Sequence, residues 1–393
     1  MRKILKGIAG NIFLLGMVSF LNDASSEIIK PILPFFIVAL GGTELVIGLV
    51  SGVMESISSI LKVVFGYLSD KLGERKIFVS SGYIFSAIFK LLLGFSYIWQ
   101  HILLFAGLER VGKGLRTAPR DAIIADSLPE KKGRGFGIHR ALDTLGAIVG
   151  ASLAFAFLYF LRLDFRTMIF ISAMMAFLSL IPMIWVREMK AKRRRDPLTF
   201  KPLDTSFKLF IFVSSLFALS NISYMFFIRK AQLLCGGEDL SLPVLLYVLF
   251  NVFYAGFAAP FGILSDRIGK DKVLIAGYAL FSLVCLGFAL SRSFYHLIPL
   301  FILYGISYAI VEGNQRALVS DLSSKSVRGT ALGIFHTTTG ILALPAGLIA
   351  GILWDCFAPW APFLFSAVLS SFSSILFAMI RRRIMHCSQE KIR

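Results

Sequence analysis

The chain has 393 residues, 56% of them hydrophobic, and a formal net charge of +18. A soluble globular domain contains roughly 45–50% apolar residues, so this composition excludes an ordinary soluble domain. The apolar residues fall into stretches of about 20, the length that a helix needs to cross a hydrocarbon core of ~30 Å. The sequence therefore predicts an all-α integral membrane protein.

Twelve apolar stretches follow one another along the chain. They cover residues 10–38, 44–67, 77–98, 101–124, 136–160, 166–186, 207–234, 242–264, 273–291, 295–320, 330–353 and 359–380. The longest hydrophilic segment separates the sixth stretch from the seventh. We therefore expect an N-terminal six-helix bundle (1–186), a basic cytoplasmic linker (187–206), a C-terminal six-helix bundle (207–380) and a cytoplasmic tail (381–393).

The basic residues are concentrated in alternate loops. They gather in both tails and around 71–76, 131–134, 187–208, 267–272 and 325–328. The opposite loops hold only Arg162, Arg166 and Arg292. This asymmetry predicts a multi-pass protein of the cytoplasmic (inner) membrane with both termini in the cytoplasm. The surplus of positive charge then indicates contact with anionic membrane lipid, and we expect no nucleic-acid partner.

A short charged loop occurs twice. Residues 66–76 reappear as 262–272, displaced by 196 positions, which is half the chain. At the same displacement Arg120 has a counterpart in Arg316, and the pair Gly137-Ile138 has one in Gly333-Ile334. A duplicated membrane domain with two pseudo-symmetric halves is typical of secondary transporters.

The repeated loop resembles the signature of the major facilitator superfamily, Gly-x-x-x-Asp-Arg/Lys-x-Gly. The matching residues are Gly66, Asp70, Lys71 and Gly73 in the first copy and Gly262, Asp266, Arg267 and Gly269 in the second. The resemblance implies twelve helices in two bundles that rock around a central site. It also implies that both loops act as gates at the membrane surface rather than as substrate sites.

Two weaker patterns of the same family bear on coupling and direction. Arg110 followed by Gly114 resembles a fourth-helix pattern whose Arg is tied to proton coupling. Gly137, Gly146 and Gly150 resemble the fifth-helix pattern of antiporters, although Ala151 replaces its proline. Close packing between helices through small residues is the alternative explanation for these glycines.

Charged residues inside the predicted spans are the best sequence evidence for a site, because each costs about 2.5–3.5 kcal/mol at a helix centre. In the N-terminal half they include Asp23, Glu27, Glu55, Glu109, Asp121, Asp143, Lys30, Lys62, Lys90, Arg110, Lys113, Arg116, Arg120 and Arg140. The C-terminal half has far fewer, among them Arg229, Lys230, Glu312 and Arg316. The N-terminal half is therefore the expected place for coupling.

Spacing divides these residues into candidates. Glu109, Lys113, Arg116 and Arg120 recur at helical intervals and share one face, as do Asp23, Glu27 and Lys30. A carboxylate that alternates between dry and wet surroundings binds and releases a proton. The proton-coupling candidates are Asp23, Glu27, Glu55, Glu109, Arg110 and Asp143. Interhelical ion pairs that only hold the bundle together are the alternative.

Substrate-binding candidates come from both halves. Basic residues suit an anionic group, and the aromatic C-terminal half suits the apolar part of an amphiphilic solute. The candidates are Lys62, Lys113, Arg116, Arg140, Asn251, Glu312 and Gln315. Arg120, Arg229 and Lys230 lie near span ends, where we expect their side chains to extend to the membrane surface.

The sequence thus predicts a proton-coupled secondary transporter of a small organic solute, with export by antiport favoured and a monomer as the working unit. The alternatives are proton-coupled uptake of an anionic solute, such as a carboxylate-rich metal chelate (a siderophore) or a phosphorylated compound, and a non-transporting membrane receptor or sensor. The four cysteines have no metal-site spacing, and no nucleotide-binding loop or hydrolase motif occurs. We therefore expect no cofactor, no metal and no enzyme activity.

Overall fold

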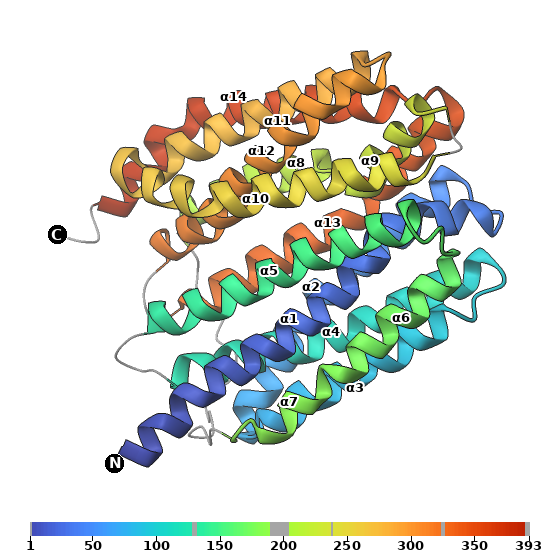
Figure 1. Ribbon diagram of the computed structural model, residues 1–393. Coiled ribbons are helices and arrows are strands. Elements are labelled where there is room, and N and C mark those ends of the chain that lie inside the picture. The colour runs from blue at the N-terminus through green and yellow to red at the C-terminus, as the bar shows by residue number, and fades with distance from the viewer. Residues whose placement is uncertain (1, 128–131, 189–203, 237–238, 324–326, 390–393) are drawn as a thin grey trace. The chain divides into compact units, whose positions relative to one another are not determined.

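The computed structural model describes residues 2–127, 132–188, 204–236, 239–323 and 327–389, and within these ranges it contains helices and turns but no strand (Figure 1). The helices are α1 (Arg2–Ala39), α2 (Glu44–Leu72), α3 (Lys76–Leu93), α4 (Trp99–Ser127), α5 (Lys132–Tyr159), α6 (Phe165–Leu178), α7 (Leu180–Trp185), α8 (Thr205–Ser220), α9 (Tyr224–Leu234), α10 (Ser241–Ile268), α11 (Lys270–Leu290), α12 (Phe294–Asp321), α13 (Arg328–Cys356) and α14 (Ala361–Gln389). The prediction of an all-α membrane fold is confirmed.

Eleven helical spans among the described residues are long and apolar enough to cross a membrane. The predicted fourth span is not among them. It corresponds to α4, whose charged residues lower its hydropathy although it is a continuous helix of 29 residues. Its length still suits a membrane crossing, since a helix rises 1.5 Å per residue.

The seventh predicted span, 207–234, is two helices rather than one. α8 ends at Ser220, and α9 begins at Tyr224 after an interruption at 221–223. The hydroxyl of Ser223 caps α9 by accepting from the backbone N–H of Met225 at 3.3 Å. Short polar side chains such as Ser and Asn bond locally to the backbone in this way and compete with a continuous helix.

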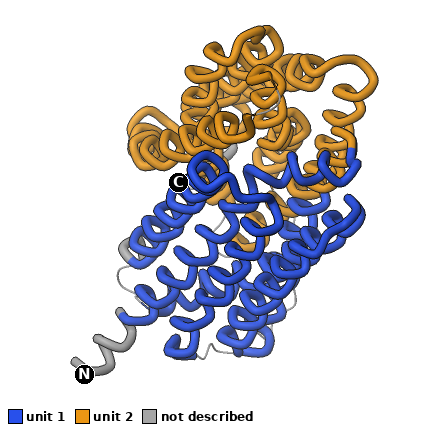
Figure 2. Tube along the Cα trace, turned by 45° about the vertical axis from the view of Figure 1, so that its right-hand side comes forward, with its two compact units in different colours: residues 1–42, 53–195 blue, residues 43–52, 196–393 orange. Residues whose placement is uncertain are grey.

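The chain forms two compact units (Figure 2). Unit 1 comprises residues 1–42 and 53–195, and unit 2 comprises residues 43–52 and 196–393. α2 therefore begins in unit 2 and continues in unit 1. Most of the predicted linker, 187–206, lies outside the described residues, so the domain boundaries stay a prediction.

The same helix pairs recur in the two units. In unit 1, α1 packs against α5; in unit 2, their counterparts α8 and α13 pack together. In unit 1 the backbones of α1 and α5 meet at Gly146 and Gly150, where an added Cβ would lie 3.0 Å from the Cα of Phe20 and 2.7 Å from the Cα of Ala24. Only glycine permits this approach. Two of the three glycines in the antiporter-like pattern thus have a packing role, whereas Gly137 has open space around it.

Candidate functional site

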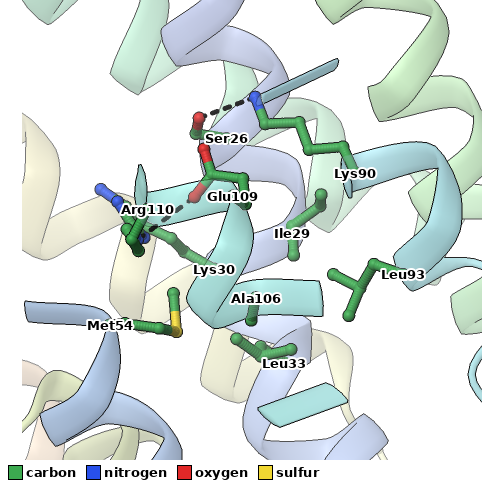
Figure 3. Close-up of a pocket in the computed structure, with 10 residues that line it drawn as sticks. All are labelled: Ser26, Ile29, Lys30, Leu33, Met54, Lys90, Leu93, Ala106, Glu109 and Arg110. Atoms are coloured by element: carbon green, nitrogen blue, oxygen red, sulfur yellow. Dashed lines mark hydrogen bonds and ion pairs between the residues drawn. The ribbon is translucent and has the colours of Figure 1, made fainter. Parts of the chain in front are cut away.

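The interior of unit 1 contains a small cavity between α1, α2, α3 and α4 (Figure 3). It has room for about one water molecule. It is lined by Ser26, Ile29, Lys30, Leu33, Met54, Lys90, Leu93, Ala106, Glu109 and Arg110. In Figure 3 the polar groups of Ser26, Lys90, Glu109 and Arg110 lie on one side and apolar side chains on the other.

Glu109 is an incompletely hydrogen-bonded acid in this cavity. Its side chain is 9% exposed, and its Oε2 lies 3.3 Å from the Nε of Arg110. Its Oε1 is buried and has no hydrogen-bond partner among the described residues. Burying a carboxylate oxygen without a hydrogen-bond donor costs free energy, so this oxygen is a site for a proton, a water molecule or a donor group of a ligand.

Asp23 of α1 and Asp143 of α5 form a carboxyl pair. The Asp143 carboxyl is close enough to act electrostatically on the carboxyl of Asp23, and Lys113 and Lys30 act on Asp23 with the opposite sign. Two ionised carboxylates repel each other, so a proton bound to one of the two relieves the repulsion. Asp143 also pairs with Arg140 at 3.3 Å, and the Arg140 side chain is about half exposed.

The other proton-coupling and basic candidates of unit 1 have different surroundings. Glu27 is buried and forms an ion pair with Lys30 one turn later. Glu55 is exposed and accepts a hydrogen bond from Ser59 at 3.4 Å. Lys62 and Lys113 are half-buried. Among the described residues, no carboxylate lies within 4.0 Å of the Lys113 ammonium.

Two arginines of α4 tie that helix to its neighbours. Arg116 donates to Ser86 and to the carbonyl of Gly82 on α3, and its guanidinium lies 4.6 Å from the centre of the Tyr83 ring. Arg120 is expected to extend to the membrane surface. Instead it donates to the Ser19 hydroxyl of α1 at 3.1 Å and pairs with Asp121. The charged residues of α4 share one face of the helix, but their side chains contact several neighbouring helices and do not line a single cavity.

The first copy of the repeated loop is closed by ion pairs around Arg75. Its guanidinium pairs with Asp70 at 3.2 Å and with Asp126 at the end of α4. The Glu188 carboxylate accepts from the backbone N–H groups of Arg75 and Lys76 at 3.1 and 2.8 Å. Gly73 takes a φ of 74°, which a residue with a side chain rarely adopts. Lys71 is exposed, and Gly66 approaches Ala118 of α4.

The second copy keeps the positive-φ glycine of the first but changes the ion pairs and shortens the turn. Gly269 has a φ of 105°, and α11 begins directly after it at Lys270, whereas α3 begins at Lys76. Lys270 pairs with Asp321 at 2.6 Å, and Asp271 pairs with Arg381 of α14.

The remaining signature residues of the second copy contribute no ion pair to this arrangement. Asp266 and Arg267 are exposed, and neither has an ion pair within the ranges that the structure describes. Gly262 has open space around it.

Unit 2 has an aromatic interior with few charges. The Tyr304 ring stacks on Phe227 and Phe250, with centroids 4.3 and 4.6 Å away. Glu312 accepts from the hydroxyl of Tyr254 and pairs with Arg316 at 3.0 Å.

The two polar amide candidates of unit 2 bond within the same interior. Gln315 donates to the Tyr278 hydroxyl at 2.7 Å, and Asn251 donates to the Tyr247 carbonyl of its own helix at 3.1 Å. Glu312 and Gln315 therefore add polar groups to the aromatic interior of unit 2, whereas Asn251 bonds to its own helix, α10.

Two features of the interior were not predicted. The sequence marks Lys90 as an intramembrane charge and assigns it no role; in the structure it is 2% exposed and lies at the centre of a hydrogen-bond cluster with α1. The sequence predicts that Arg229 and Lys230 extend to the surface; instead Arg229 pairs with Glu44 at 2.5 Å, and Lys230 is buried. The signal for Lys90 was available, because a lone charge within an apolar span needs buried partners.

Among the described residues, no group of three or more His, Cys, Asp or Glu could hold a metal ion. The model of the Major Facilitator Superfamily matches residues 15–236 and 209–391 of the chain. The chain belongs to the major facilitator superfamily. It is a multi-pass membrane transporter and not an enzyme, and it handles a small solute as the family does.

Known members of the superfamily resemble the chain over most of its length. The MFS-type transporter MJ1317 of Methanocaldococcus jannaschii, named as uncharacterized, is 51% identical over 381 residues, or 95% of each chain. The multidrug resistance protein MdtG of Proteus mirabilis is 28% identical, covering 80% of this chain and 81% of that protein. The crystal structure of the nucleoside transporter NupG matches with a TM-score of 0.77 at 16% identity, covering 94% of this chain and 98% of that one. This last likeness concerns the fold alone.

Proposed function

We propose that this transporter moves a small organic solute by alternating access and couples the movement to protons through unit 1. The Asp23–Asp143 carboxyl pair is the observation that carries the proposal, because two neighbouring carboxylates repel each other unless one of them binds a proton. A conformational change that separates α1 from α5, or admits water between them, removes this repulsion and releases the proton. Glu109, with its unpartnered Oε1, is a second proton-binding candidate.

The favoured direction is export by antiport across the cytoplasmic membrane, with both termini in the cytoplasm. MdtG bears the name of a multidrug resistance protein. A transporter that confers resistance lowers the internal concentration of a toxic compound, so this likeness supports export. The loops around Asp70 and Asp266 then serve as the cytoplasmic gates, and a monomer suffices for the cycle.

Uptake of an anionic solute is the second candidate. It is favoured by the Lys113 ammonium, which has no carboxylate within 4.0 Å among the described residues. Arg116 is less suited to the role of anion ligand, since its guanidinium is already engaged by Ser86, Gly82 and the Tyr83 ring. Lys113→Ala should therefore weaken a carboxylated or phosphorylated ligand more than a neutral one, and Arg116→Ala should not discriminate between them.

The test of proton coupling uses purified protein in proteoliposomes. A thermal-shift screen of organic cations, anions and zwitterions at two pH values first identifies a ligand. Asp143→Asn and Glu109→Gln should then abolish flux driven by a pH gradient while leaving counterflow exchange of that ligand intact. Asp164→Asn is the matched control, because Asp164 is an exposed helix cap and Asn caps a helix equally well. Unchanged gradient-driven flux in both interior variants would refute the proposal.

A further inference from the structure

Lys90 of α3 is held by a cage of oxygen atoms from one side of α1. Its Nζ lies 2.9 Å from the Oγ of Ser25, 2.9 Å from the Oγ of Ser26, 3.3 Å from the carbonyl oxygen of Asn22 and 3.4 Å from the Oδ1 of Asn22. The three residues occupy positions i, i+3 and i+4 of α1, so their polar groups share a face. Lys90 is 2% exposed, and Asn22 and Ser25 are buried as completely.

The other hydrogen bonds of the cage residues leave lone pairs on their oxygens that can accept from the Lys90 ammonium. Ser25 donates its proton to the carbonyl of Ser172 on α6 at 2.7 Å, and Ser26 donates to the carbonyl of Asn22 at 3.0 Å. The amide nitrogen of Asn22 points to Asp23 at 3.5 Å, which leaves its Oδ1 for Lys90. A hydroxyl has one proton and two lone pairs, so each serine can only accept from the ammonium.

The cage has the chemistry of a monovalent-cation site. Its four ligands are uncharged hard oxygens, of the kind that bind a desolvated cation through carbonyl and hydroxyl dipoles. Within the part of the chain that the structure describes, no carboxylate lies within 4.0 Å of the ammonium. An ion pair thus does not account for its position.

We propose that the Lys90 ammonium is a built-in cation that occupies a monovalent-cation site of α1. Tethered to α3, it supplies the positive charge that Na⁺ or K⁺ would otherwise bring, and it fastens α1 to α3 without drawing on an ion gradient. Wild-type stability and transport are then indifferent to the choice of Na⁺, K⁺ or choline, and Lys90 is the residue that determines this indifference.

Removal of the tether should expose the site. Purified Lys90→Ala is melted in matched chloride salts of choline, Na⁺, K⁺, ammonium and methylammonium. We expect it to melt below wild type in choline and to regain several degrees in at least one of the small cations, as ligand binding to the folded state requires. Wild type should show no such selectivity. Lys90→Met fills the space without a charge, so it should stay destabilised in every salt.

A second substitution assigns the response to the cage. Lys90→Ala combined with Ser26→Ala removes one oxygen ligand and should weaken the cation response several-fold in concentration. If Lys90→Ala melts alike in all five salts, or responds equally with and without Ser26, the proposal is wrong.

A cage variant that retains the lysine covers the case in which Lys90→Ala does not fold. Ser26→Ala should then lower the melting temperature of the lysine-bearing protein more than Ser81→Ala, because the exposed hydroxyl of Ser81 donates to a carbonyl of its own helix. Equal effects of the two serine substitutions would overturn the proposal.

Discussion

Replacing Arg229 tests the energetics of the buried charges most directly. Arg229 of α9 donates to the Oε1 of Glu44 from both Nε and Nη2, at 2.8 and 2.5 Å. The carboxylate of Asp355 on α13 accepts from the backbone N–H groups of Glu44 and Leu45 at 3.3 and 2.9 Å. All four residues belong to unit 2, where the first turns of α2 are held by side chains of two other helices.

Arg229→Met removes one charge and leaves Glu44 buried without a counter-charge. Breaking a buried ion pair in this way costs about 3–5 kcal/mol. The side chains of Arg229 and Glu44 retain 11% and 8% of their exposure, so some water reaches them. We therefore take the lower end, about 3 kcal/mol, which corresponds to a fall of about 6–12 °C in melting temperature for a unit of roughly 200 residues.

The assay is a double-substitution cycle on purified protein, with melting followed at equal detergent and salt. Arg229→Met and Glu44→Gln should each destabilise, and the double variant should lie closer to wild type than either single one, because it leaves no unpaired charge. Arg292→Met is the matched control, since Arg292 is exposed. If Arg229→Met costs no more than Arg292→Met, or if the two effects simply add, the buried pair does not stabilise the fold.

Two further predictions concern helix packing and the second loop. Gly150→Ala should lower the melting temperature by the equivalent of about 1–3 kcal/mol, because its Cβ would press on the backbone of α1 at Ala24, whereas Gly137→Ala should be nearly neutral; equal effects would contradict the packing role. Asp271→Arg should impair transport and stability by opposing Arg381, and Arg381→Asp in the same chain should restore part of both, as measured by counterflow and melting; no recovery in the double variant would show that this ion pair is not needed.

The fold could be predicted from hydropathy because each span repeats the same physical requirement, a length of apolar helix. α4 shows how far this holds. Its charges exclude it from the spans that hydropathy alone identifies, yet the match of Arg120 to Arg316 identifies it as the sequence counterpart of α12. The break at 221–223 could not be predicted, since the run from 207 to 234 is apolar on both sides of it and the cap at Ser223 is a local hydrogen bond.

The partners of the buried charges could not be predicted, because contact between distant residues depends on how the helices pack. Glu44 and Arg229 are 185 positions apart, and nothing in the intervening sequence relates them. Spacing along one helix correctly grouped Asp23, Glu27 and Lys30 on α1. It could not show that Lys90 of α3 would be bonded from the same helix, at Asn22, Ser25 and Ser26.

The two copies of the repeated loop share a glycine with positive φ and differ in their ion pairs. Both copies keep a glycine with positive φ, Gly73 and Gly269, but α11 begins directly after Gly269, whereas α3 begins only at Lys76. The residue at the next-but-one position differs in sign, since Arg75 of the first copy corresponds to Asp271 of the second, and each finds a partner of opposite charge. The positive-φ glycine is therefore constrained by backbone geometry, whereas the ion pair needs only opposite signs and can change both its residues and its partner helix.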